Sequence, residues 1–299
     1  MNTPHVALVS ARAAHKLDED LPPLRTALEA AGALVTIAKW DDAAVEWSRF
    51  DLAVLRSTWD YAQRLPEFLA WVQRTAARTR LLNPVEVVRW NTDKHYLAEL
   101  EDAGVPVVPS MFAEPGDNAE QALEAFLVAY PHAGDFVIKP AIGAGSRDAQ
   151  RHLREQRDPA LTHLLRLLDA NRSTLLQPYL HSVDDHGETA LLFFHGEFSH
   201  AIRKGPLLRR GEAPTRALFA TEQITAREPS QAERAVAQRA LAAIPFEQPL
   251  LYARVDLIHD AQGAPRVLEL ELTEPSTFLD HAPGAATRFA LAILDRIRQ

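Results

Sequence analysis

Apolar residues in the first third of the chain form short runs separated by segments with helical spacing. The runs that predict buried strands are His5–Ser10, Ala33–Ala38 and Asp51–Leu55. Asp18–Ala31 and Pro66–Arg78 carry apolar residues at helical intervals instead. This alternation is typical of an open α/β sheet with helices packed on it. We therefore predict an N-terminal α/β lobe over residues 1–90.

The middle of the chain predicts a second lobe, over residues 91–177. Its expected helices are Thr92–Ala103, Asn118–Ala129 and Pro159–Ala170. Its expected strands are Val105–Met111, Phe136–Pro140 and Thr174–Gln177.

The last part of the chain, residues 178–299, predicts a third lobe in which strands predominate. The expected strands are Thr189–Phe194, Glu197–Arg203, Leu250–His259 and Arg266–Leu272. Ser230–Ala243 and Ala285–Arg298 have helical spacing, and residues 205–223 lack periodicity and are predicted to form a loop.

Composition narrows the classes of function. A formal charge of −8 argues against a nucleic-acid partner, because phosphate backbones require concentrated Lys and Arg. The absence of cysteine excludes disulfides, thiolate nucleophiles and Cys-ligated zinc. No apolar run is long enough for a signal-peptide core or a membrane span. We expect a cytoplasmic protein without membrane contact.

The strongest local signal is acidic and lies near the C-terminus. Two apolar strands carry Asp256 on the first and Glu269 and Glu271 on the second. Alternate strand residues share a face, so the two glutamates face one way, and a hairpin can bring Asp256 opposite them. Three carboxylates together would repel unless a cation sits among them, which suggests Mg²⁺. The alternative is a solvated acidic sheet face, which the apolar surroundings disfavour.

A second signal combines lysine with glycine. Lys139 ends an apolar strand, and the loop 141–146 with Gly143 and Gly145 follows at once. Glycine-bearing loops can close backbone N–H groups on an anion, and a lysine adds a point charge for phosphate. The chain has neither a Walker A loop nor a Rossmann fingerprint. Lys94, judged alone, is typical of a surface lysine.

Taken in order, these motifs resemble the ATP-grasp superfamily in its glutathione-synthetase-like branch, over essentially the whole chain. The resemblance implies an ATP-grasp fold of α/β class, with an N-terminal open sheet lobe followed by two α+β lobes that clasp ATP. Residues 56–61, 200–204 and 269–276 are similar to the cyclo-ligases of D-cycloserine biosynthesis. That enzyme group converts O-ureido-D-serine to D-cycloserine with ATP.

The resemblance also implies roles for individual residues. The implied ATP-binding residues are Lys94, Lys139, Gly143, Gly145, Ser146, Gln177, Tyr179 and Leu180. The implied metal ligands, for Mg²⁺ or alternatively Mn²⁺, are Asp256, Glu269 and Glu271. The basic residues expected at the transferring phosphate are Arg203, Lys204 and Arg254. The substrate-binding residues are expected to be Arg56, Ser57, Thr58, Trp59, Asp60, Tyr61, Thr273, Glu274 and Ser276.

Two positions depart from the family pattern. Pro178 stands where the adenine hinge more usually carries Glu, and Glu271 replaces a common Asn. The second change should keep metal binding while adding negative charge.

The implied function is an ADP-forming carbon–nitrogen ligase that activates a small amino acid as an acyl phosphate and closes a ring. The expected partners are that small molecule and further copies of the chain in a homo-oligomer. Three alternatives use the same motifs: an intermolecular carboxylate–amine ligase, a small-molecule kinase, and a nucleotide-binding regulatory protein without catalysis.

Overall fold

The computed structural model describes residues 3–212 and 223–298. The helices are α1 (Leu21–Ala30), α2 (Leu65–Ala76), α3 (Val85–Asn91), α4 (Tyr96–Asp102), α5 (Ala119–Ala129), α6 (Arg157–Asp169), α7 (Ser182–His186), α8 (Gln231–Ala242) and α9 (Ala285–Arg298). The strands are β1 (His5–Ser10), β2 (Leu34–Lys39), β3 (Leu52–Ser57), β4 (Arg80–Leu82), β5 (Met111–Ala113), β6 (Asp135–Pro140), β7 (Gln150–Leu153), β8 (Thr174–Pro178), β9 (Glu188–Phe194), β10 (Glu197–Lys204), β11 (Ile224–Arg227), β12 (Tyr252–His259) and β13 (Pro265–Glu271).

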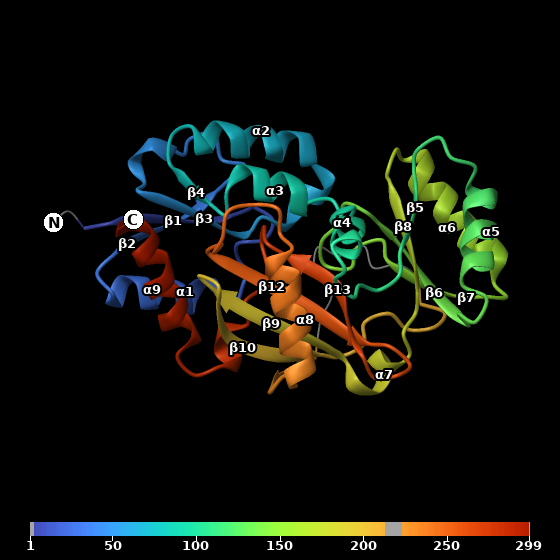
Figure 1. Ribbon diagram of the computed structural model, residues 1–299. Coiled ribbons are helices and arrows are strands. Elements are labelled where there is room, and N and C mark those ends of the chain that lie inside the picture. The colour runs from blue at the N-terminus through green and yellow to red at the C-terminus, as the bar shows by residue number, and fades with distance from the viewer. Residues whose placement is uncertain (1–2, 213–222, 299) are drawn as a thin grey trace.

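The N-terminal strands form a parallel sheet in the order β2-β1-β3-β4. Alternate residues of β1 and β3 belong to two different cores, so the sheet is buried on both faces. α1 packs with α9 on one face, and α2 covers the other with a group of aromatic residues. The predicted open α/β sheet is thereby confirmed (Figure 1).

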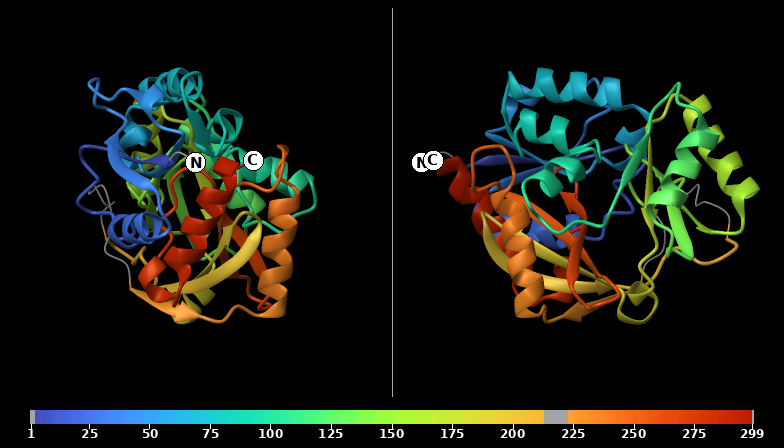
Figure 2. Two further views of the ribbon diagram at one scale, coloured as in Figure 1. Left: turned by 90° about the vertical axis from the view of Figure 1, so that its left-hand side faces the viewer. Right: turned by 45° about the vertical axis from the view of Figure 1, so that its right-hand side comes forward.

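A smaller antiparallel sheet, β5-β8-β6-β7, lies at the other end of the molecule. α5 and α6 pack on its outer face around a core that includes Phe126, Ile138 and Leu164 (Figure 1). The opposite face, on which Lys139 ends β6, is turned toward the third sheet (Figure 2).

The third sheet, β11-β10-β9-β12-β13, is antiparallel and joins the other two parts. α8, α3 and α4 cover one of its faces in a shared core. At the end of β9, Phe194 stacks on Phe289 of α9 with ring centroids 4.3 Å apart. Because these cores cross the predicted boundaries, the division into 1–90, 91–177 and 178–299 stays a prediction.

Two predicted elements differ from the structure. The expected strand Val105–Met111 reduces to a single bridge between Val107 and Val267, because Pro106 and Pro109 have no N–H to donate. The expected helix from Thr92 begins only at Tyr96, so Lys94 lies in the turn between α3 and α4.

The short elements α3, β4, β7 and β11 carry too little periodicity to be predicted. The predicted loop 205–223 lies partly outside the described residues, which resume before β11. Within the described ranges, none of the helices has the length and apolar run that crossing a bilayer requires.

Candidate active site

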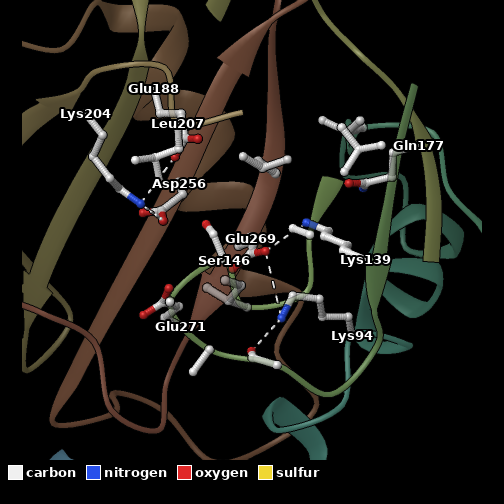
Figure 3. Close-up of a pocket in the computed structure, with 18 of the residues that line it drawn as sticks. Lys94, Lys139, Ser146, Gln177, Glu188, Lys204, Leu207, Asp256, Glu269 and Glu271 are labelled. Atoms are coloured by element: carbon white, nitrogen blue, oxygen red, sulfur yellow. Dashed lines mark hydrogen bonds and ion pairs between the residues drawn. The ribbon is translucent and has the colours of Figure 1, made fainter. Parts of the chain in front are cut away.

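A deep cavity lies between the small sheet and the large sheet, and the segment after β3 closes one end. It is lined by these residues predicted from the sequence: Trp59, Tyr61, Lys94, Lys139, Gly143, Gly145, Ser146, Gln177, Tyr179, Leu180, Lys204, Arg254, Asp256, Glu269, Glu271, Glu274 and Ser276. The predicted residues outside this lining are Arg56, Ser57, Thr58, Asp60, Arg203 and Thr273. The structure therefore brings most of the predicted set together (Figure 3).

A bulge in β13 puts the acidic residues on one face. Counting from the turn after β12, Leu257 pairs with Val267, but Asp256 pairs with Glu269 because Leu268 is an extra residue. Without this bulge, Asp256 would face Leu268 and both glutamates would point away from the cavity.

Two lysines compensate the charge of Glu269. Lys139 Nζ lies 2.8 Å from Glu269 Oε1, and Lys94 Nζ lies 3.8 Å from the same oxygen. Burial alone would raise the pKa of Glu269, but the two lysines more than offset this and hold it well below its ordinary range. Figure 3 shows both lysines pointing at this carboxylate.

Asp256 is almost fully buried and held by two cations. Lys204 Nζ lies 2.5 Å from its Oδ2, and the Arg254 guanidinium binds both oxygens, at 2.8 and 2.9 Å. Burial alone would raise the pKa of Asp256, but Arg254 and Lys204 lower it below the ordinary value. Arg254 also binds Glu271, so one guanidinium joins two of the predicted metal ligands.

Two carboxyl groups of the cavity have raised pKa values, because their charged forms are disfavoured where they lie. Burial raises the pKa of Glu271 to about 7, with the charges of Asp256 and Glu269 adding to the effect. Burial, reinforced by the charge of Glu271, raises the pKa of Glu274 to about 8. The cavity therefore favours the binding of additional positive charge.

Glu274 makes the free energy of unfolding depend on pH. Its folded pKa of about 8 exceeds the ordinary value of 4.5, so its contribution is fully present below 4.5 and is lost as pH rises through about 8. The neutral variant Glu274→Gln should raise the melting temperature of the ligand-free protein by about 5 °C at about pH 8.5. At about pH 5 the two proteins should melt nearly together. Calorimetry at both pH values tests this, and equal melting at the higher pH would contradict the raised pKa.

A second bulge, in β10, decides which basic residue faces the cavity. The register with β9 shifts between Phe198 and His200, so Lys204 pairs with Glu188. Lys204 thus shares the face of Asp256, and its Nζ also lies 3.2 Å from Glu188 Oε2. The sequence did not predict Glu188 as a site residue, because its place beside Lys204 depends on the shifted register.

Arg203 points away from the cavity. Its guanidinium donates to the main-chain carbonyls of His186 and Asp185 at 2.7 and 3.1 Å. Arg203→Gln should therefore change kcat/KM by less than about 3-fold, as is usual for a residue away from the reacting groups. Steady-state kinetics tests this expectation, and a loss of about 100-fold or more would return Arg203 to the catalytic set.

The glycine loop is tied to the turn before α4. Lys94 Nζ donates to the Gly143 carbonyl at 3.0 Å, and its backbone N–H donates to the Ala141 carbonyl. Gly145 and Ser146 both have left-handed φ angles, of 62° and 58°. Such a turn aims successive N–H groups to one side, which suits an anion.

Protein contacts occupy the polar side chains of the segment after β8. Gln177 Nε2 donates to Ser110 Oγ at 2.9 Å, and the Tyr179 hydroxyl donates to Asp184 at 2.6 Å. The Arg151 guanidinium lies 3.5 Å from the centre of the Tyr179 ring. The remaining wall beside this segment is apolar, formed by Val108, Val137, Ile258 and Leu268.

Several predicted substrate-binding residues are buried behind the cavity lining. Arg56 is almost fully buried and donates to the Pro275 carbonyl at 2.8 Å. The Ser57 hydroxyl bonds Ser10, and Asp60 accepts from the Trp40 indole at 2.9 Å. Thr58 and Thr273 are also buried. Arg56 thus holds the segment 273–278. Because these residues lie outside the cavity lining, their direct contact with a ligand stays a prediction.

In the described parts of the chain, no three Asp, Glu or His side chains form a ready metal-binding group. The three carboxylates predict a cation among them, and Lys139, Lys204 and Arg254 carry positive charge at that place. The raised pKa of Glu271 nevertheless fits a hard divalent cation, because oxygen ligands with surplus negative charge are what Mg²⁺ prefers.

Comparison with solved structures defines the class of protein. The chain superposes on the ATP-grasp ligase PsnB, in complex with a phosphomimetic variant of a minimal precursor, Mg and ADP, with a TM-score of 0.64. The match covers 99% of each chain at 20% sequence identity, which establishes the fold. The chain therefore has the ATP-grasp fold, as the sequence predicted.

Closer relatives define the family. Residues 6–83 match the family model described as D-cycloserine synthetase DcsG, N-terminal domain. The cycloserine biosynthesis protein DcsG of Streptomyces lavendulae is 43% identical over 98% of this chain and 99% of its own length. The crystal structure of D-cycloserine synthetase DcsG superposes with a TM-score of 0.91, at 43% identity over 98% of this chain and 99% of that one. The chain belongs to the DcsG family of D-cycloserine synthetases.

Proposed function

We propose that this protein is an ATP- and Mg²⁺-dependent ligase that activates a small amino acid as an acyl phosphate and closes it into a ring. The proposed reaction is O-ureido-D-serine to D-cycloserine. One observation carries the proposal: a single cavity joins a lysine-anchored glycine loop to a cluster of carboxylates and basic residues. Membership in the DcsG family supports the substrate and product.

The cavity offers distinct regions to the parts of ATP. The apolar wall beside Gln177–Leu180 suits the base, which would be recognised by main-chain groups because Gln177 and Tyr179 are bonded to protein. Lys94, Lys139 and the loop with Gly143, Gly145 and Ser146 would hold the phosphates.

Asp256, Glu269 and Glu271 would hold Mg²⁺, which when bound offsets the negative charge of the phosphates. Lys139 and Arg254 form ion pairs with these carboxylates, and the same two cations would attract the phosphate oxygens of ATP.

The proposed reaction has three steps: phosphoryl transfer, ring closure and loss of the carbamoyl group. The substrate carboxylate attacks the γ-phosphorus, and ADP leaves as the acyl phosphate forms. Lys204 and Arg254 would balance the charge spread over the transferring group. The ureido nitrogen bonded to oxygen then attacks the acyl carbon, a C–N bond forms, and phosphate leaves with loss of the N–H proton. Water finally removes the carbamoyl group as carbon dioxide and ammonia.

The acyl phosphate can be tested with oxygen isotopes. Substrate labelled with ¹⁸O in its carboxylate should transfer one labelled oxygen to inorganic phosphate for each ring closed, because the acyl C–O bond breaks. Phosphate without label would exclude this route.

The same incubation separates the rival functions. A stable phosphorylated product would indicate a kinase, and ADP release that requires a second amine would indicate an intermolecular ligase. Absence of ADP with any acid would indicate a nucleotide-binding regulatory protein.

A further inference from the structure

The cavity lining includes a buried carboxyl group and two aromatic side chains from the segment after β3. Glu274 is 8% exposed and lines the cavity together with Trp59 and Tyr61. The Trp59 indole N–H donates to the main-chain carbonyl of Glu274 at 3.1 Å. The Tyr61 side chain lowers the pKa of the Glu274 carboxyl group, against the larger rise that burial causes. The aromatic faces and the carboxyl group thus belong to one small region.

Among the described residues, Glu274 differs from the other carboxylates of this cavity because no salt bridge joins it to a cation. Asp256 has Lys204 and Arg254, and Glu269 has Lys139. Across residues 3–212 and 223–298, no Lys, Arg or His forms a salt bridge with Glu274. The rise of its pKa to about 8, through burial and the charge of Glu271, agrees with this. A buried carboxylate without a cation is costly, so the region favours a ligand that brings one.

The segment that carries Glu274 is rigid. The Asn91 amide oxygen accepts from the Leu272 N–H at 2.7 Å, and Arg56 donates to the Pro275 carbonyl at 2.8 Å. Asp20 accepts from the N–H of Thr277 at 2.6 Å and of Leu279 at 2.8 Å. A backbone segment held by these bonds has little ordering entropy left to lose when a ligand binds.

Arg254 contacts both the segment that carries Glu274 and the predicted metal ligand Asp256. Its Nη1 donates to the Ser276 carbonyl at 3.0 Å, two residues from Glu274, while its other nitrogens bind Asp256. A ligand whose anionic group lies near Arg254 would therefore have its neighbouring groups near Glu274. In an α-amino acid, the group one carbon from the carboxylate is a primary ammonium.

We propose that Glu274, with the rings of Trp59 and Tyr61, is the subsite for the α-ammonium group of the substrate. This inference rests on the proposed function and specifies how its substrate is oriented. The carboxylate supplies an ion pair and the aromatic faces attract the same cation. An acid without this amino group leaves the Glu274 carboxylate unpaired and binds weakly.

The test compares the amino substrate, O-ureido-D-serine, with its deamino counterpart, 3-(ureidooxy)propanoate. The wild type should prefer the amino compound by about 100-fold in kcat/KM, the scale of a buried charge pair. Glu274→Gln should raise KM for the amino compound by about 100-fold, leave KM for ATP unchanged and abolish the preference. Tyr61→Phe should do the same to a smaller extent, about 5-fold.

Glu197→Gln, at the exposed start of β10, is the matched control and should leave both substrates unaffected. Equal losses with both compounds in Glu274→Gln, or a wild type that does not distinguish them, would overturn the subsite.

Calorimetric binding of the same two compounds separates this inference from the proposed reaction. If the wild type closes no ring, the proposed function fails. An amino preference in binding that Glu274→Gln removes would still support the subsite. Equal binding of the two compounds, or no binding of either, would overturn it.

Discussion

Replacing Glu269 with Gln is expected to lower kcat by about 1,000-fold or more and to leave the chain folded. The amide can still accept the hydrogen bond from Lys139, which now lies 2.8 Å from Glu269. It cannot supply the negative charge that balances Lys94 and Lys139 or that would hold Mg²⁺. The loss of stability should therefore be modest, about 1–2 kcal/mol, whereas turnover collapses. Steady-state ADP release and urea unfolding of the same preparation measure the two effects.

Glu29→Gln is the control for this substitution. Glu29 is exposed. Among the described residues, its only salt bridge is to Arg25 of the same helix, at 2.8 Å. Its loss should cost less than about 0.5 kcal/mol and no activity. Activity in Glu269→Gln within about 10-fold of the wild type would remove Glu269 from the proposed metal site.

Arg254→Lys is expected to have the second-largest effect, on both activity and stability. The guanidinium binds both oxygens of Asp256, contacts Glu271 and donates to the Ser276 carbonyl. A lysine ammonium has no planar fork and cannot make these contacts together. We expect kcat/KM to fall by about 1,000-fold and the free energy of unfolding by about 2 kcal/mol, because buried carboxylates lose partners.

Arg288→Lys provides the matched comparison. Arg288 is exposed and donates to the carbonyls of Pro283 and Ser199 at 3.0 and 3.3 Å. Its replacement should leave kcat/KM unchanged, and denaturant unfolding should shift by less than about 1 kcal/mol. If Arg254→Lys behaved like Arg288→Lys, Arg254 would have no part in balancing charge at the reacting phosphate.

The regular elements could be predicted because their apolar periods are long and uninterrupted. β1, α1 and β12 follow from such patterns, and the resemblance to the ATP-grasp superfamily supplied their arrangement. The strand expected from Val105 does not form, because Pro106 and Pro109 lack backbone N–H donors. The spacing of apolar residues does not reveal this lack.

The sequence predicted which residues form the site better than it predicted how their side chains are oriented. An extra residue at Leu268 turns Glu269 toward Asp256, and a register shift in β10 turns Lys204, rather than Arg203, into the cavity. A one-residue shift reverses the face of every later side chain, and nothing in the local sequence marks either bulge.

Long-range pairing also lay beyond the sequence. The contact between Lys139 and Glu269 joins residues far apart in the chain, as does the contact between Arg56 and Pro275. From the sequence alone, a bound metal is the expected source of positive charge among the three carboxylates. In the structure, basic side chains from other strands already supply much of that charge.

The central claim is tested most directly by incubating the purified protein with ATP, Mg²⁺ and O-ureido-D-serine and no added amine. ADP release and the organic product, followed by mass spectrometry, are the measurements. We predict one ADP for each D-cycloserine formed, with carbon dioxide and ammonia released. No ADP from this substrate, together with ADP from another acid in the presence of an amine, would contradict the ring-closing reaction.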